Sequence, residues 1–192
     1  MRILCFGDSN TYGYDPRSYI GGRYDAENRW VDILAQRTGW EVVNAGLCGR
    51  RIPQRPHERK RVNGLLSEHN PDIFLIMLGT NDLLQGASAA EVGSRMEAFL
   101  MQILPACKNS LLLAPPALKR GAWVEDDRLV TESALLAEEY ERLAARLGIS
   151  FANTARWDIT LAFDGVHFSE EGHQVFAEHL LHVLNRKDDT FQ

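Results

Sequence analysis

A serine near the beginning of the chain and an aspartate–histidine pair near its end have the residue types of a nucleophilic catalytic group. Ser9 directly follows an apolar segment, within Gly7-Asp8-Ser9-Asn10-Thr11. A serine hydroxyl is a weak nucleophile at neutral pH, so it needs a base and a third group that orients the base. Asp164 and His167 are suitably spaced: two residues lie between them, one of them a glycine that lets the chain turn. The carboxylate can then accept from one ring nitrogen while the other faces Ser9. Each residue also has an ordinary alternative: a helix cap, a turn former or a buried structural histidine.

Hydrogen-bond donors for a developing oxyanion are expected in two other loops. Gly46 follows the second apolar segment, where a missing side chain lets a backbone N–H approach a substrate closely. Asn81 follows the third, within Gly79-Thr80-Asn81-Asp82, and its side-chain amide can donate. The backbone N–H of Ser9 is the third predicted donor. The alternatives are a tight turn at Gly46 and a helix cap at Asn81.

Candidates for the wall of a substrate pocket are less distinctive. Two tyrosines follow the nucleophile, one tryptophan lies in the long connection after the fourth apolar segment, and another lies shortly before Asp164. For these aromatic residues, core packing or a subunit contact is an equally good explanation. The substrate-binding candidates are Asn10, Tyr12, Tyr14, Trp123 and Trp157.

Short apolar segments alternate with helical patterns along the chain, and this order predicts the elements that position those residues. Helical stripes of apolar residues begin near Trp30, Val92 and Leu135, and a last helix is expected from Ser169 to about Asn185. The predicted strands are Arg2 to Phe6, Glu41 to Asn44, Asp72 to Leu78, Ser110 to Ala114 and Ile149 to Ala152.

Strands that alternate with helices pair in parallel through right-handed crossovers. The predicted fold class is therefore α/β: a three-layer, flavodoxin-like arrangement with a five-stranded parallel sheet flanked by helices. In such sheets the functional loops follow the carboxyl ends of the strands. Ser9, Gly46, Asn81 and the Asp164 loop all follow predicted strands, so they are expected at one edge of the sheet.

Length and composition indicate one soluble domain. The 192 residues suit a single core, predicted over residues 1–186 with a frayed tail at 187–192. No signal-peptide pattern or long apolar segment is present, and the three cysteines form no pair, so we expect a cytoplasmic protein without a membrane anchor, disulfide or zinc site.

Charge argues against a nucleic-acid partner, because the formal net charge is -5. One local stretch is nevertheless basic, and it comprises Arg50, Arg51, Arg55, Arg59, Lys60 and Arg61. A solvated loop and helix face or a subunit contact is the favoured interpretation of this stretch, and an anionic-substrate site is the alternative.

The ordered blocks Gly7-Asp8-Ser9, Gly46, Gly79-Thr80-Asn81-Asp82 and Asp164-x-x-His167 resemble those of the SGNH (GDSL-like) serine hydrolases over nearly the whole chain. This resemblance implies a nucleophilic Ser9, His167 as its base with Asp164 as partner, and Gly46 and Asn81 as oxyanion donors. Arg29-Trp30, Pro115-Pro116 and Asp164-Gly165-Val166-His167-Phe168 are similar to the arylesterase and acyltransferase branch, which implies a cytoplasmic homo-oligomer. Asn10 departs from the leucine that is commonest at its position.

Together these features predict a serine esterase that hydrolyses short-chain aryl or alkyl esters through an acyl-enzyme, with water or an alcohol as acceptor. It would need no metal or cofactor, and its partner would be a small-molecule ester. One alternative uses the same residues as a carbohydrate O-deacetylase or a thioesterase or lysophospholipase. The other is a non-catalytic module that binds phosphate or flavin.

Overall fold

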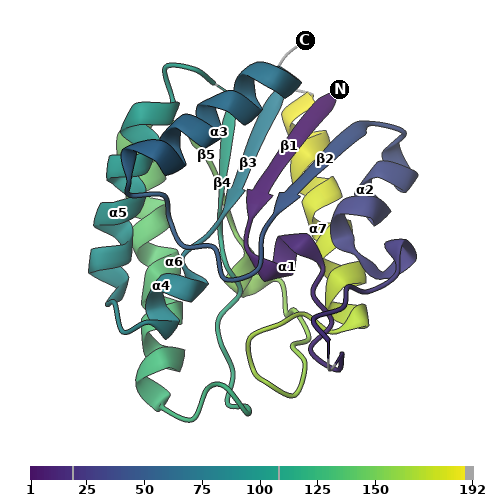
Figure 1. The fold of residues 1–192 in the computed structure, drawn as a ribbon, viewed down its shortest axis with the longest axis vertical. Coiled ribbons are helices and arrows are strands. Elements are labelled where there is room, and N and C mark those ends of the chain that lie inside the picture. Colours follow the sequence, from purple (N-terminus) through teal and green to yellow (C-terminus); the bar gives the residue numbers. More distant parts are fainter. Residues whose placement is uncertain (19, 108, 189–192) are drawn as a thin grey trace.

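Five parallel strands form one sheet in the order β2-β1-β3-β4-β5 (Figure 1). The computed structural model describes residues 1–18, 20–107 and 109–188. All five predicted strands are present, and their observed ends differ from the predicted ends by at most two residues. The strands are β1 (Arg2–Gly7), β2 (Glu41–Gly46), β3 (Ile73–Met77), β4 (Ser110–Ala114) and β5 (Ser150–Asn153).

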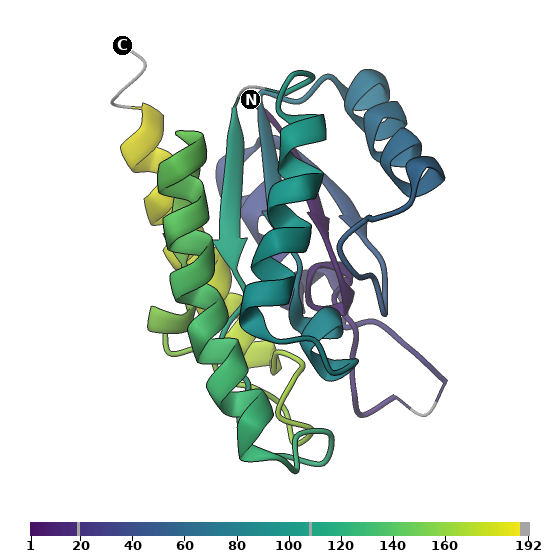
Figure 2. The ribbon, with the colours of Figure 1, turned by 90° about the vertical axis from the view of Figure 1, so that its left-hand side faces the viewer.

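Helices cover both faces of the sheet, which gives three layers and confirms the predicted α/β class (Figures 1 and 2). Alternate residues of β1 enter different cores: Leu4 and Phe6 pack in one, and Ile3 and Cys5 in the other. The first core contains residues of α3 (Pro56–His69), α5 (Ala89–Ile103) and α6 (Asp127–Leu147). The second contains residues of α2 (Trp30–Thr38) and α7 (Glu170–Asp188).

Two short helices begin where central strands end. Helix α1 (Ser9–Tyr12) follows β1, and α4 (Thr80–Leu84) follows β3. Because parallel strands share one carboxyl edge, both helices lie at the same edge of the sheet, below the strands in Figure 1. The 3₁₀ turns η1 (Ala26–Asn28) and η2 (Thr154–Arg156) complete the elements.

The basic stretch continues into a full helix that apolar periodicity did not reveal. Pro56 begins α3, where its fixed φ suits a first helical position. Only Val62 and Leu66 of this helix are buried, so the apolar signal is weak. At the other end, α7 continues beyond Asn185 to Asp188, and the rest of the predicted tail lies outside the described residues.

Candidate active site

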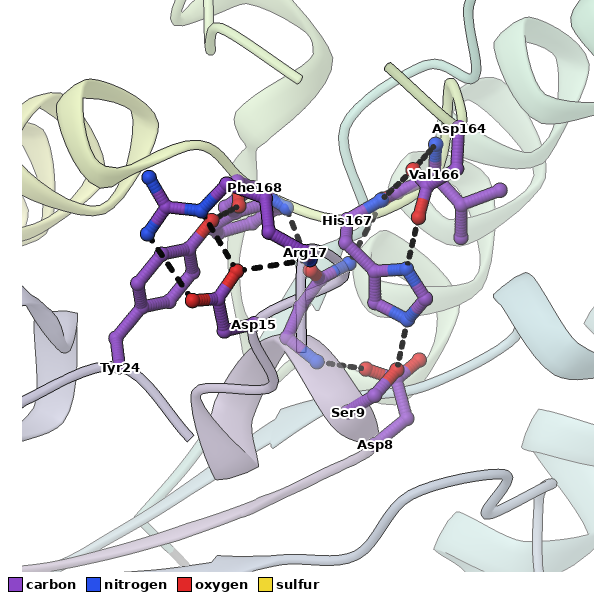
Figure 3. Close-up of polar contacts among 10 residues, drawn as sticks. Asp8, Ser9, Asp15, Arg17, Tyr24, Asp164, Val166, His167 and Phe168 are labelled. Carbon is purple, nitrogen blue, oxygen red and sulfur yellow. Dashed lines mark hydrogen bonds and ion pairs between the residues drawn. The ribbon is translucent and has the colours of Figure 1, made fainter. Parts of the chain in front are cut away.

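Ser9, His167 and Asp164 form a continuous line of hydrogen bonds at the carboxyl edge of the sheet (Figure 3). His167 Nε2 lies 3.0 Å from Ser9 Oγ, and His167 Nδ1 lies 2.6 Å from Asp164 Oδ2. All three side chains are buried in the protein. With neutral histidine, Nδ1 donates to the carboxylate and Nε2 is free to accept the serine proton. The arrangement can therefore generate an attacking serine oxygen.

The Asp164 carboxylate performs two structural tasks with its two oxygens. Oδ2 accepts from the His167 ring, while Oδ1 accepts from the backbone N–H groups of Val166 and His167, both at 2.9 Å. Burial raises the pKa of Asp164, but the hydrogen bonds from the His167 ring and from these N–H groups outweigh it and hold the pKa below its usual value. The side chain therefore remains ionised and orients the imidazole at neutral pH.

Asn10 connects the nucleophile helix to the histidine loop, and this corrects its predicted place in a pocket wall. Its amide Nδ2 donates to Val166 O at 3.1 Å, and its Oδ1 accepts from Phe168 N at 2.9 Å. The two contacts lie on either side of His167 in the chain. Since Asn10 is buried and both amide ends are engaged, its side chain fixes the distance between α1 and His167 and does not present itself to a substrate.

The predicted donor Asn81 lies beside the site. Its Nδ2 donates to Arg50 O at 3.1 Å and makes a longer contact of 3.5 Å with Asp8 Oδ2. Because the second contact is at the limit of a hydrogen bond, one N–H of the amide can be redirected toward an oxyanion. Asn81 therefore ties the loop after β2 to the nucleophile segment.

Gly46 does not have the predicted role in this structure. Its N–H donates to Asn44 Oδ1 at 2.9 Å, and a Cβ at this position would lie 2.2 Å from Tyr12 N. A glycine is thus required here so that α1 can pack on β2. Gly49, three residues on, has a φ of 72°, is exposed, and its N–H is donated to none of the described residues. It adjoins Arg50, whose carbonyl accepts from Asn81, so Gly49 lies beside the candidate site.

Two predicted aromatic residues lie against His167. The ring centroid of Tyr14 is 4.7 Å from that of the histidine, and the centroid of Trp123 is 5.1 Å away with the rings edge to face. Trp123 N donates to Asp164 O, which holds the 119–124 segment against the catalytic loop. Trp123 is 54% exposed, and its neighbour Phe163, which the sequence did not single out, is 63% exposed. The Tyr14 and Trp123 rings therefore form an aromatic border beside His167, and the Trp123 ring is open to solvent.

The other two aromatic candidates lie elsewhere. The Arg23 guanidinium lies over the Tyr12 ring, 4.2 Å from the ring centroid, and Arg23 Nε also donates to Tyr12 O. Trp157 stacks on His179 and packs edge to face on Phe176, so its ring belongs to the α7 side of the core. The prediction that Trp157 lines the substrate pocket, which was based on its closeness to Asp164 in sequence, is therefore wrong.

Comparison with known proteins assigns the family. The GDSL-like lipase/acylhydrolase family matches residues 5–175, which is most of the chain. The chain belongs to this family. This GDSL-like protein is accordingly an enzyme of the carboxylic-ester hydrolase class. The resemblance to the SGNH hydrolases that the sequence motifs indicated is confirmed. No curated protein sequence matches the chain.

Solved structures agree with the assignment of this GDSL-like hydrolase. It is similar to an aryl esterase from M. smegmatis, with a TM-score of 0.83 and 26% identity over 96% of this chain and 98% of that one. A putative arylesterase from Agrobacterium tumefaciens str. C58 has a TM-score of 0.83 and 30% identity, covering 97% and 99%. A carbohydrate acetylesterase from Sinorhizobium meliloti has a TM-score of 0.83 and 25% identity, covering 97% and 99%.

Two kinds of feature are absent from the described part of this GDSL-like hydrolase. None of its helices there has the length and apolar character needed to cross a membrane. Within the same residues, no group of three or more His, Cys, Asp and Glu side chains is arranged to hold a metal ion.

Replacing Asn10 by leucine, the commonest residue of the family pattern at this position, tests its role as a positioning residue. The variant leaves the buried Val166 O and Phe168 N–H without hydrogen-bond partners. We therefore expect the free energy of unfolding to decrease by about 2–4 kcal/mol. We also expect kcat on a short ester to fall about tenfold to a hundredfold with little change in KM, because His167 loses its fixed distance to Ser9. Both are measured well below the melting temperature. Asn63→Leu, on the exposed face of α3, is the matched control; equal kcat values for the two variants would contradict the role.

Asp8 lies next to the nucleophile, and its burial raises the pKa to about 6. The Asn10 N–H and the charges of His167 and Arg50 lower the pKa but do not cancel this effect. The folded protein therefore binds a proton that the unfolded chain has already released between about pH 4 and pH 6. This stabilises the fold at low pH, and the contribution disappears as the pH rises through about 6.

We expect Asp8→Asn to remove that part of the pH dependence. Relative to the variant, the wild-type free energy of unfolding should decrease by up to about 3 kcal/mol from pH 4 to pH 7. Urea denaturation across this range measures the difference. Asp158→Asn, at an exposed position, should follow the wild-type curve. A constant difference between wild type and Asp8→Asn at all pH values would refute the prediction.

Proposed function

We propose that the protein is a serine esterase that hydrolyses short-chain acyl esters of aryl or alkyl alcohols. The observation that carries the proposal is the unbroken contact from Ser9 Oγ through His167 to Asp164. Ser9 Oγ attacks the ester carbonyl and gives its proton to His167 Nε2. His167 then protonates the leaving alcohol, which departs and leaves an acyl-enzyme. Water attacks the acyl-enzyme with His167 as base, and the carboxylic acid is released.

Three groups are proposed to donate to the oxyanion that forms in each step. They are the backbone N–H groups of Ser9 and Gly49 and the Asn81 side-chain amide. Gly49 is favoured over Gly46 because its N–H is uncommitted among the described residues, whereas that of Gly46 donates to Asn44. Donors fixed in advance stabilise the transition state without reorganisation.

The acyl and alcohol groups are proposed to be small. Tyr14 and Trp123 offer aromatic surface beside His167, and the exposed rings of Trp123 and Phe163 suit an aryl or other flat group better than a long chain. The similar carbohydrate acetylesterase makes acetylated sugars the second candidate, because an exposed tryptophan can also support a sugar ring. Acyl transfer to alcohols and assembly into a homo-oligomer remain predictions.

A panel of substrates tests the proposal. The purified protein is assayed with p-nitrophenyl esters from acetate to octanoate and with acetylated glucose, each with and without benzyl alcohol. We expect the highest kcat/KM for the shortest aryl esters and a burst of p-nitrophenolate equal to the enzyme concentration, which reports the acyl-enzyme. A preference for acetylated glucose would support the second candidate. Failure to hydrolyse any ester would reject the esterase function.

A further inference from the structure

A cavity lined by arginines lies beside the candidate active site, and of its lining residues only Gly49 has a part in the proposed mechanism. It has a volume of about 650 Å³ and lies between the loop after β2, α3 and α5. The loop runs under the sheet edge and then up to α3 (Figure 1). Ser9 and His167 do not line this cavity, but Gly49 does. Its size is that of pockets that hold small molecules.

The walls of the cavity carry an excess of positive charge. Its lining arginines are Arg50, Arg51, Arg55, Arg61 and Arg95. Two carboxylates also line it, and both are already engaged. Asp82, which is 1% exposed, accepts from Arg95 at 2.9 Å and from Ile52 N at 3.0 Å. Glu58 accepts from the backbone N–H groups of Gln54 and Arg55 at the start of α3.

Four of the five lining arginines form no ion pair with any residue that the structure describes: Arg50, Arg51, Arg55 and Arg61. Arg55 is nevertheless close enough to Glu58 for its charge to lower the pKa of that carboxyl. This concentration contrasts with the formal net charge of -5 of the whole chain. Guanidinium groups present planar pairs of N–H donors that match carboxylate and phosphate oxygens. An anion between them would be held by several donors at once.

Arg50 fixes the inner end of the cavity. Its guanidinium lies 4.2 Å from the Phe6 ring centroid and donates to Gly7 O at 2.8 Å and to Ala45 O. Burial lowers the pKa of Arg50 to about 10; the charge of Asp8 raises it, and that of Arg61 lowers it further. Arg61 is thus close enough to Arg50 for repulsion between the two cations, which a bound anion would relieve.

The cavity also has an apolar part. Phe6, Ile52 and Val62 are buried residues that line it, and Leu65 of α3 is half-buried beside them. A ligand that fills the cavity therefore needs an apolar or ring-shaped body in addition to its charge. We propose that this cavity is a second binding site, for a small organic anion that carries a phosphate or carboxylate group on such a body.

Direct binding measurements test the proposal independently of the esterase function. Isothermal titration calorimetry uses phenyl phosphate, isophthalate and neutral benzamide at low ionic strength. We expect at least one of the two anions to bind one-to-one, with an affinity that decreases as salt is added. Benzamide should not bind. The relative affinities of the two anions identify the preferred acid group. Absence of binding for both anions, or equal binding of benzamide, would overturn the proposal.

Variants locate the site, because a phosphate could instead bind at the oxyanion donors near Ser9. The double variant Arg51→Gln/Arg61→Gln should weaken the affinity at least about tenfold, since it removes charge-assisted hydrogen bonds. Arg55→Gln supplies a second test if the double variant does not fold. Arg142→Gln, exposed on α6 and paired with Glu138 and Glu139, is the control and should bind as the wild type does. Unchanged affinity in the cavity variants would place the anion elsewhere and refute the site.

Discussion

Ser9→Ala should lower kcat/KM for a short aryl ester by about ten thousandfold to a millionfold, while KM changes little. The substitution removes the oxygen that lies 3.0 Å from His167 Nε2, and no acyl-enzyme can then form. Removal of a nucleophile of this type leaves only the rate supplied by binding and by the oxyanion donors. Initial rates with p-nitrophenyl acetate measure the effect.

The matched control for Ser9→Ala is Ser94→Ala. Ser94 is exposed on α5 and its hydroxyl donates to Ala90 O within the helix, so this variant should retain wild-type rates. Labelling with a fluorophosphonate gives a second readout: one equivalent in wild type and in Ser94→Ala, and none in Ser9→Ala. Retained hydrolysis by a folded Ser9→Ala protein would mean that the nucleophile is another residue.

Asp164→Asn should lower kcat by about ten thousandfold with the fold intact. An asparagine can keep an oxygen in the Oδ1 place, where it accepts from the N–H groups of Val166 and His167. Its NH₂ then occupies the Oδ2 place and donates to His167 Nδ1, which forces the proton onto Nε2. A histidine in that tautomer cannot accept the serine proton. Kinetic assays at neutral pH, together with circular dichroism, separate this effect from unfolding.

Asp25→Asn provides the control for this change of charge. Asp25 is exposed and its side chain makes no capping hydrogen bond to η1, so the variant should have wild-type kcat. If Asp164→Asn retained more than about a tenth of the wild-type kcat, orientation of the imidazole by Asp164 would not be needed for the reaction.

The strands and the catalytic group could be predicted because their signals are local. Ser110–Ala114 reads SLLLA between turn residues, and it is a fully buried strand with those bounds. Asp164 and His167 are close in the chain, so their mutual contact follows from spacing. Their meeting with Ser9 follows from topology, since parallel strands bring successive loops to one edge.

The remaining features depend on contacts that spacing does not encode. Gly46 and Gly49 are both plausible in Asn44-Ala45-Gly46-Leu47-Cys48-Gly49, and only the packing of Gly46 on Tyr12 separates a structural glycine from a free N–H. Trp157 is near Asp164 in sequence, but its ring stacks on His179 of α7. An anion site on the basic stretch was only the alternative interpretation of the sequence, because α3 buries too few apolar residues to reveal how its basic side chains face the loop after β2.

The contact between Ser9 and His167 joins residues 158 positions apart in the chain. During synthesis the nucleophile leaves the ribosome 158 residues before its base. Until the Asp164–His167 loop docks on Asn10, Ser9 is an ordinary alcohol, so a nascent chain or a truncated fragment cannot attack esters. Recovery of activity during refolding should therefore follow recovery of helical signal, since activity reports the docking of the Asp164–His167 loop on the segment that carries Ser9.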